Sequence, residues 1–278
     1  MLLQRDREFL HAAFQKCYDL VKDSDFHRRF AEEKIRHSLQ VFGAGNYIIK
    51  NEPSLNHRDE GFLKKARQAV LLHDVGRFAE ILNLYRHPEK RQSDPLLFDH
   101  GLLGAEILEK NRFYQSPSIV LSVRHHGHLA EEFYHDPDYR AIIDSQERQE
   151  TEEIWKLVRD ADKIANLYLI VREYRFLHDL FFSGLSSEEK SAPISPEIWQ
   201  DFMDCRIIDW KKIRSLKDRI LQIIAFNFEL YFPASDRFME RLQINRRLLQ
   251  IFSGYEKDKK ILEKVSQCLY DYIESKHQ

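Results

Sequence analysis

Residues 69–77 read AVLLHDVGR and end a run of helical spacing. Ala66 and Ala69 fall on the same face of that expected helix as His73, so His73 lies on an apolar surface. The carboxylate of Asp74 beside it would lose hydration, which is costly unless a partner or an ion compensates. A metal ion bound by both residues would remove this cost.

The dipeptide His-Asp also occurs at residues 135–136 and 178–179, so context has to separate the three copies. The copy at 135–136 precedes Pro137 in a polar stretch, which is typical of a turn. The copy at 178–179 lies near a helix end, which is typical of capping or solvation. We interpret both of these copies as structural.

Composition indicates an ordered, mostly helical protein. The chain has 278 residues, 43% hydrophobic and 32% charged, with 9 glycines and 8 prolines, too few for a turn-rich β architecture. Helical spacing predicts an all-α fold, a helical bundle with additional C-terminal helices. Helices are expected at residues 9–18, 27–42, 61–74, 99–111, 152–174, 197–210, 212–231 and 237–255, with a start at Ser116-Pro117, a break at residues 43–46 and loops within 131–149.

A domain boundary is expected at residues 183–196, where Ser, Gly, Pro and charged residues cluster. Residues 1–185 would form the metal-binding helical domain. Residues 186–278 would form an accessory helical region packed on the first.

Charge and cysteine usage narrow the function classes. The formal net charge of −2 provides no field that would attract nucleic acid or an anionic membrane, so an anionic substrate must be held locally. The cysteines Cys17, Cys205 and Cys268 are far apart and form no C-x-x-C pair, which predicts neither a disulfide framework nor a thiolate zinc site. With no signal-peptide pattern and no long apolar run, we expect a soluble cytoplasmic protein of open oligomeric state.

The expected helix at 152–174 carries a second inward carboxylate. Asp162 aligns with Val158 and Ala165 on its apolar stripe. Asp160 falls on the other side with Lys163 and is expected to face solvent, so it serves as the control for Asp162.

Histidines supply the remaining candidate ligands. His37 lies at the edge of an apolar helix face and His100 precedes Gly101, where another segment can approach closely. Either histidine alone would more often be structural. The pair His125-His126 ends an apolar helix, and neutral imidazoles there are good ligands for iron, manganese, zinc or nickel.

The ordered series of these residues resembles the HD-domain metal-dependent phosphohydrolase superfamily over about residues 20–180. With His100 and the pair His125-His126, the series resembles the ligand pattern of the multi-metal subset, which includes the HD-GYP phosphodiesterases. The chain has no Gly-Tyr-Pro segment after the histidine pair, which argues against cyclic-di-GMP hydrolysis. The resemblance implies a metal centre with the ligands His37, His73, Asp74, His100, His125, His126 and Asp162.

The resemblance also implies roles for these residues. His37, His73, Asp74 and Asp162 would hold one ion, and Asp74 would bridge to a second ion held by His100, His125 and His126. Of these, His126 would either bind the ion itself or contact a residue that does. The family's Asp-x-Gly-Lys continuation is here Asp74-Val75-Gly76-Arg77, so a guanidinium replaces the ammonium group.

The expected activity is hydrolysis by a water that two divalent metal ions activate, most simply Fe or Mn, with Zn, Ni and Mg as alternatives. The substrate would be a small phosphoester, a nucleotide or a related compound. The residues expected to act in catalysis are Asp74, Arg77 and Arg124, and Lys163 is a further candidate for a phosphate contact.

Two other functions remain open at this point. The same ligands could hold a di-iron pair that activates oxygen, as in oxygenases similar to this superfamily. Alternatively, the metal centre could be structural or sensory, with the helices of residues 197–278 binding a partner. Oxygen consumption would support the first alternative, and partner-dependent signalling without turnover would support the second.

Overall fold

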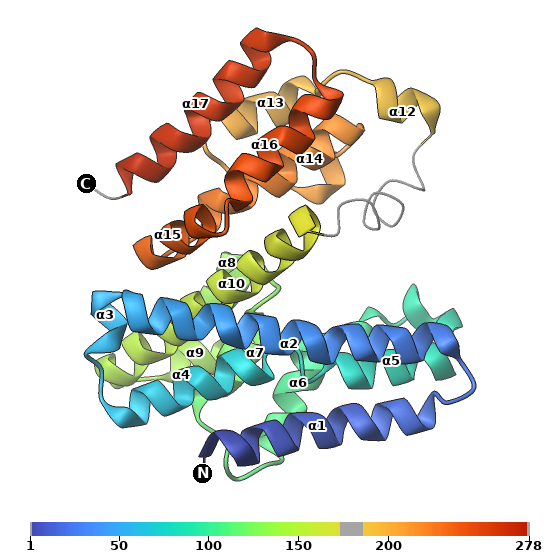
Figure 1. Ribbon diagram of the computed structural model, residues 1–278. Coiled ribbons are helices and arrows are strands. Elements are labelled where there is room, and N and C mark those ends of the chain that lie inside the picture. The colour runs from blue at the N-terminus through green and yellow to red at the C-terminus, as the bar shows by residue number, and fades with distance from the viewer. Residues whose placement is uncertain (1, 173–185, 277–278) are drawn as a thin grey trace. The chain divides into compact units, whose positions relative to one another are not determined.

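The computed structural model describes residues 2–172 and 186–276, and within these ranges the secondary structure is helical with no strand (Figure 1). The prediction of an all-α fold is confirmed. The chain forms two compact units, Met1–Asp162 and Lys163–Gln278. The expected boundary at 183–196 begins inside residues 173–185, which lie outside the described residues, as do residues 178–179 with the third His-Asp pair.

Unit 1 contains most of the helices that the sequence predicts. Two of them begin at an aspartate cap: Asp59 accepts a hydrogen bond from the amide of Phe62, and Asp99 accepts one from the amide of Leu102. The helices of unit 1 are α1 (Leu2–Leu20), α2 (Asp25–Asn51), α3 (Pro53–Asn56), α4 (Glu60–Leu72), α5 (Arg77–Arg86), η1 (Pro88–Arg91), η2 (Pro95–Phe98), α6 (His100–Glu109), α7 (Pro117–His125), α8 (Ala130–His135), α9 (Pro137–Ala141) and the first part of α10 (Ser145–Arg172).

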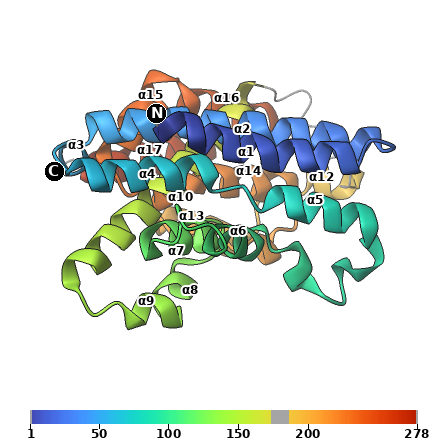
Figure 2. The ribbon, with the colours of Figure 1, turned by 90° about the horizontal axis from the view of Figure 1, so that it is seen from below.

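The helices of unit 1 pack as two layers. Helix α2 packs against α1, α4 and α5, and α6 and α7 pack against each other (Figure 2). Helix α7 also packs on α4, which joins the layers. Apolar side chains fill the space between them, among them Leu71, Leu72, Leu108, Leu121 and Val123, each at most 1% exposed.

The expected break at residues 43–46 is wrong, because α2 continues through it to Asn51. Of the two glycines in this stretch, Gly45 allows close packing of two helices rather than a turn. A Cβ atom on Gly45 would lie 2.6 Å from Cγ1 of Val70 on α4, so a larger residue would push the two helices apart. Glycine therefore lets α2 approach the helix that leads into His73.

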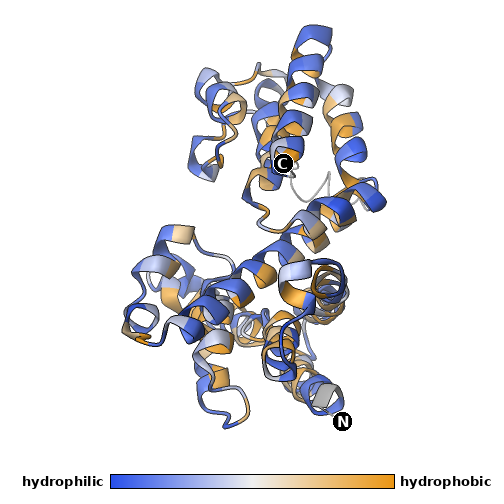
Figure 3. Ribbon diagram, turned by 90° about the vertical axis from the view of Figure 1, so that its left-hand side faces the viewer, coloured by the Kyte–Doolittle hydropathy of each residue, from blue (hydrophilic) through white to orange (hydrophobic). Residues whose placement is uncertain are grey.

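Unit 2 is a second group of packed helices, and apolar residues are buried along most of them (Figure 3). Asp218 ties two helix starts together, since its carboxylate accepts hydrogen bonds from the hydroxyl and the amide of Ser195. The helices are α12 (Ser187–Ser191), α13 (Pro196–Met203), η3 (Trp210–Lys212), α14 (Leu216–Ala225), η4 (Phe226–Glu229), α15 (Pro233–Arg241), α16 (Ile244–Tyr255) and α17 (Lys259–Ser275). None of the described helices is long and apolar enough to cross a membrane.

Candidate metal centre

Six of the predicted ligands meet inside unit 1, and we call them the candidate centre. They come from helices or from the residues that directly follow helices: His37 from α2, His73 and Asp74 after α4, His100 at the start of α6, His126 after α7 and Asp162 from α10. The side chains of His73, Asp74 and His126 are at most 4% exposed, whereas those of His100 and Asp162 are each 19% exposed. The group is therefore buried on one side and open to solvent on the other.

The carboxylate of Asp74 faces two groups of nitrogens. Its Oδ2 atom lies 3.8 Å from Nε2 of His73, while its Oδ1 atom lies 3.5 Å from Nε2 of His100 and 3.4 Å from Nε2 of His126. Two sets of residues can each hold a metal ion, because the donor atoms within each set all lie within 4.8 Å of one another. The first set is His37, His73 and Asp74, and the second is Asp74, His100 and His126. Asp74 is thus the residue through which the two sets connect.

Asp162 completes the first set. Its Oδ1 atom lies 2.8 Å from Nε2 of His37 and 3.6 Å from Nε2 of His73. The helical spacing predicted that this carboxylate faces inward, and the structure places it beside the two histidines with which the resemblance grouped it.

The orientation of the imidazoles shows whether a cation fits. The Nδ1–H group of His73 donates to the carbonyl of Val70 at 3.0 Å, and that of His126 donates to the carbonyl of Val123 at 2.7 Å. A carbonyl can only accept, so neutral rings at both positions carry the proton on Nδ1 and leave Nε2 as a bare lone pair. Within the described chain, the buried Nε2 of His73 has no hydrogen-bond partner. Lone pairs and carboxylates that face each other in this way fit a divalent metal ion.

The charge states favour metal binding as well. Burial raises the pKa of Asp74, but the ammonium group of Lys34 and the neighbouring His73 outweigh it and hold the pKa well below its usual value. Burial likewise raises the pKa of Asp162, but the hydrogen bond from His37, together with the neighbouring His73, outweighs it and holds the pKa well below its usual value. Burial and the nearby His126 lower the pKa of His100 well below its usual value, so this ring is neutral at pH 7.

Two cations border the centre. Nζ of Lys34 lies 3.5 Å from Oδ2 of Asp74, and Nε of Arg77 lies 3.4 Å from Oδ1 of the same carboxylate. Nη1 of Arg77 also donates to Glu80 at 2.7 Å. The sequence pointed to Arg77 but missed Lys34, although Lys34 precedes His37 by three residues and therefore lies on the same helix face.

The prediction of His125 as a ligand needs correction. Its Nε2 atom lies 2.6 Å from Oδ2 of Asp136, and its Nδ1 atom lies 3.2 Å from Nδ1 of His128. Nε2 of His128 lies in turn 3.0 Å from Oδ2 of Asp99. We call this second group the outer cluster: Asp99, Arg124, His125, His128 and Asp136. Consecutive helical residues point about 100° apart, so His125 joins this cluster while His126 joins the centre.

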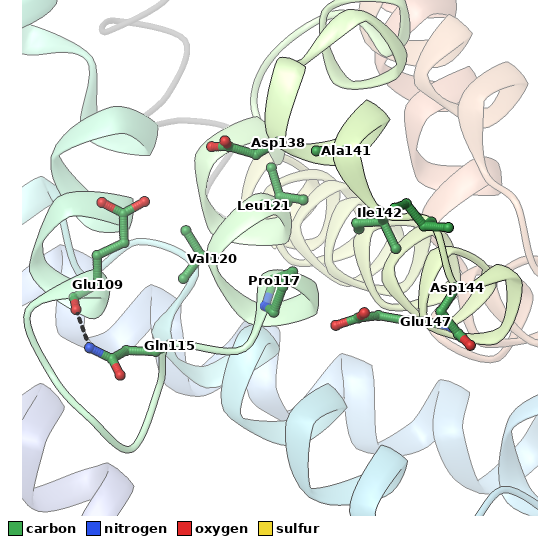
Figure 4. A pocket seen from close by; sticks show the side chains of 11 residues that line it. Glu109, Gln115, Pro117, Val120, Leu121, Asp138, Ala141, Ile142, Asp144 and Glu147 are labelled. Carbon is green, nitrogen blue, oxygen red and sulfur yellow. Dashed lines mark hydrogen bonds between the residues drawn. The ribbon is translucent and has the colours of Figure 1, made fainter.

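Arg124 also belongs to the outer cluster rather than to the centre. Its guanidinium binds Asp136 at 3.0 Å, Asp138 at 2.7 Å and Glu109 at 2.8 Å. Glu109 and Asp138 line an open hollow of about 530 Å³ (Figure 4). The described lining of this hollow includes no residue of the candidate centre. The expected role of Arg124 in binding a substrate at the metal centre is therefore not supported by its position.

Asp136, which the sequence interpretation treated as a turn residue, has a double role. One carboxylate oxygen caps α9 by accepting from the amides of Asp138 and Tyr139, as a turn residue would. The other oxygen accepts hydrogen bonds from His125 and Arg124. Nothing in the sequence signals this second role, because the partners lie 11 and 12 residues away in a different helix.

Backbone contacts hold the ligand-bearing segments together. A Cβ atom on Gly76 would collide with the carbonyl of His100, and one on Gly101 would collide with the carbonyl of Arg124. The expectation that Gly101 allows a close approach is thus confirmed. Nε1 of Trp155 donates to the carbonyl of His125 at 3.1 Å, and Arg159 donates to the carbonyl of His126 at 3.2 Å. Helix α10 therefore fixes the turn that carries His126.

Two further predictions on α10 are corrected. Asp160, expected to face solvent, is 0% exposed, because residues 157–161 are all buried and the helix has no solvent face there. Lys163, a candidate for a phosphate contact, is the first residue of unit 2, and its Nζ atom lies 3.0 Å from Oε2 of Glu229 in the same unit. Asp160 is therefore unsuitable as a control for Asp162.

A comparison with protein families agrees with this geometry. Residues 35–167 match the family model of the HD domain, and this range includes all six residues of the candidate centre. Over these residues the chain is therefore similar to the HD domain, an all-α fold whose members bind divalent metal ions and are generally metal-dependent hydrolases. No curated protein and no solved structure matches the chain.

Proposed function

We propose that this chain is a metal-dependent phosphohydrolase that binds two divalent ions and hydrolyses a small phosphoester. The observation that carries the proposal is the division of the Asp74 carboxylate, whose Oδ2 faces His73 and whose Oδ1 faces His100 and His126. A carboxylate that offers one oxygen to each of two donor sets is suited to bridge a pair of ions, as in two-metal hydrolases.

The donor sets suggest which residues would hold each ion. His37, His73 and Asp162 would join Asp74 at the first ion, and His100 and His126 would join Asp74 at the second. Imidazole and carboxylate donors without thiolates suit iron and manganese, and they also accept zinc or nickel. When bound, the ions would acidify a shared water and offset charge that develops on a phosphoryl group.

The chain's own contribution would be to position the substrate. The side chains of Lys34 and Arg77 lie beside Asp74 and are 20% and 24% exposed, so solvent reaches both of them. Both can bind phosphate oxygens there, the ammonium group as a point charge and the guanidinium as a planar donor. Because the formal net charge of the chain is only −2, these local cations are what would attract an anionic substrate such as a nucleotide.

The test is phosphate release by the purified chain after loading with Mn²⁺ or Fe²⁺ under anaerobic conditions. A monoester, a diester and a panel of nucleotides should each be assayed, with EDTA-treated protein alongside. We expect metal-dependent release from at least one phosphoester, and we expect that oxygen is not required.

The control variant is Glu106→Gln, which alters an exposed carboxylate on the same helix as His100. It should retain the activity of the unaltered chain, while Asp74→Asn should not. Protein that is fully loaded with metal but releases no phosphate from any phosphoester would contradict the proposal. Oxygen consumption coupled to loss of an organic substrate would point to the oxygenase instead.

A further inference from the structure

Two cysteines that are far apart in the sequence meet inside unit 2. Cys205 follows α13 and Cys268 lies on α17, and their Sγ atoms are 3.7 Å apart. Both residues are free thiols of intermediate burial, unlike Cys17, which is 0% exposed. The sequence did not predict a thiol pair, because the packing of α13 against α17 creates it.

The backbone of Cys205 is the second unusual feature. Its φ of 52° lies in the left-handed region. The amide of Arg206 donates to the carbonyl of Asp201 at 2.9 Å, and the amide of Cys205 donates to that of Phe202 at 3.0 Å. This pair of bonds is a Schellman motif, which usually has glycine at the left-handed position. A residue with a Cβ atom is strained there, so a cysteine at this position calls for a role of its side chain.

Helix α17 packs on the rest of unit 2 through several contacts, among them the ring of Tyr272 against that of Phe228. The buried residues of its described length are Val265 and Leu269, and Cys268 lies on the same side between them. The thiol of Cys268 donates to the carbonyl of Phe202 at 3.4 Å, at the end of α13. A covalent bond at Cys268 would therefore fasten α17 to the end of α13.

We propose that Cys205 and Cys268 are a modification site, at which a peroxide converts the two thiols into a reversible disulfide that clamps α17 to α13. The sulfurs need to approach by about 1.6 Å to reach the bonded distance of about 2.05 Å. The proposal is independent of the chemistry at the metal centre, since it concerns unit 2 alone.

The reaction balances with one peroxide per disulfide. The sulfur of Cys205 attacks one peroxide oxygen, which breaks the O–O bond and yields a sulfenic acid and one water. The sulfur of Cys268 then attacks the sulfenic sulfur, the S–O bond breaks, and hydroxide leaves with the thiol proton as a second water. Burial, together with the neighbouring Cys205, raises the pKa of Cys268 to about 12, so we assign the first attack to Cys205.

The experiment treats the reduced full-length chain with hydrogen peroxide and follows intact mass, peptide maps and the melting temperature. We expect the loss of two hydrogens, a peptide that links residues 205 and 268, reversal by dithiothreitol, and a rise in Tm of at least about 5 °C. Hydrogen exchange in residues 259–275 should slow in the oxidised form.

Two variants control for folding. Cys205→Gly removes the thiol and relieves the backbone, so the reduced variant should melt at or above the temperature of the unaltered chain and form no internal disulfide. Cys17→Ser should form the disulfide as the unaltered chain does. The proposal is overturned if Cys205 and Cys268 remain separate thiols, if they oxidise to sulfinic acids, or if the linkage joins two chains.

Discussion

The candidate centre and the outer cluster lie next to each other, and both are built from histidines and aspartates. In the outer cluster, Nε2 of His125 faces Asp136 at 2.6 Å and Nε2 of His128 faces Asp99 at 3.0 Å. In the centre, the buried Nε2 of His73 has no such partner among the described residues. The two groups therefore differ in the unpartnered Nε2 of His73 rather than in the types of residue present.

The two groups differ in their partners because of how helix ends direct side chains. His73 and His126 each follow the last residue of a helix, and each turns its Nδ1–H to a carbonyl three residues earlier. This interaction fixes the proton on Nδ1 and aims Nε2 away from the helix. His125, one residue earlier, points to a different side and finds a carboxylate. Matched variants in the two groups can therefore test the assignment.

The largest expected effect comes from the paired carboxylates Asp74 and Asp136. Asp74→Asn should remove both ions and lower phosphate release on the order of a thousandfold, because the bridge between the donor sets is lost. Asp136→Asn should retain the metal content of the unaltered chain. Elemental analysis and the phosphate assay measure both outcomes, and equal metal loss in the two variants would contradict the comparison.

The adjacent histidines give the next largest contrast. His126→Ala should leave about one ion per chain, because the second donor set keeps only Asp74 and His100. His125→Ala should keep both ions and should instead destabilise the fold, since it leaves Asp136 without one of its partners. If His125→Ala loses an ion and His126→Ala does not, our correction of the sequence prediction is wrong.

The cationic residues Lys34 and Arg124 provide a third pair of matched variants. Lys34→Ala should raise KM for a phosphoester about tenfold, the cost of one charge-assisted hydrogen bond. Arg124→Ala should leave KM unchanged, because its guanidinium binds Glu109, Asp136 and Asp138 in the outer cluster. Steady-state kinetics on metal-loaded protein decide the matter, and an equal rise in KM for both variants would refute the assignment of Lys34.

The smallest expected effect concerns stability and pH. Burial raises the pKa of Asp136, but hydrogen bonds from His125 and Arg124 outweigh it and hold the pKa below its usual value. A carboxylate whose pKa is lowered on folding stabilises the protein above its unfolded pKa of about 3.9, and this contribution is lost as the pH falls through the folded pKa. Asp136→Asn should therefore cost about 2 kcal/mol at pH 7 and less below pH of about 4.

Urea unfolding of EDTA-treated protein at both pH values measures this cost without interference from metal loss. Glu106→Gln serves as the control, because the side chain of Glu106 is 63% exposed and its ion pair is with Lys110, which is 78% exposed. A penalty for Asp136→Asn that stays constant or grows in acid would show that its carboxylate does not stabilise the fold as an anion.

The sequence predicted the all-α fold and three members of the candidate centre, His73, Asp74 and Asp162, for identifiable physical reasons, whereas His37, His100 and His126 entered through the resemblance. Inward positions of Asp74 and Asp162 follow from helical periodicity, which depends on neighbours within two turns. The starts of α4 and α6 carry aspartate caps, and α7 begins with the proline expected at residue 117. Local signals of this kind can be found without knowledge of the tertiary structure.

What the sequence could not supply depends on contacts between distant segments. The choice between His125 and His126 depends on the direction of a helix end and on Asp136 from another helix. The burial of Asp160 arises because α10 is covered all round at that point, which a one-faced amphipathic pattern cannot indicate. The glycine at 45 looked like a helix break because its real partner, Val70, lies on another helix.

The central claim is that Asp74 joins two metal sites. Elemental analysis of the purified chain, reconstituted anaerobically with Mn²⁺ or Fe²⁺ and then desalted, tests it most directly. The account predicts about two ions per chain in the unaltered protein. A single ion per chain at saturation, bound with His37, His73 and Asp162 while His100 and His126 stay unligated, would contradict it.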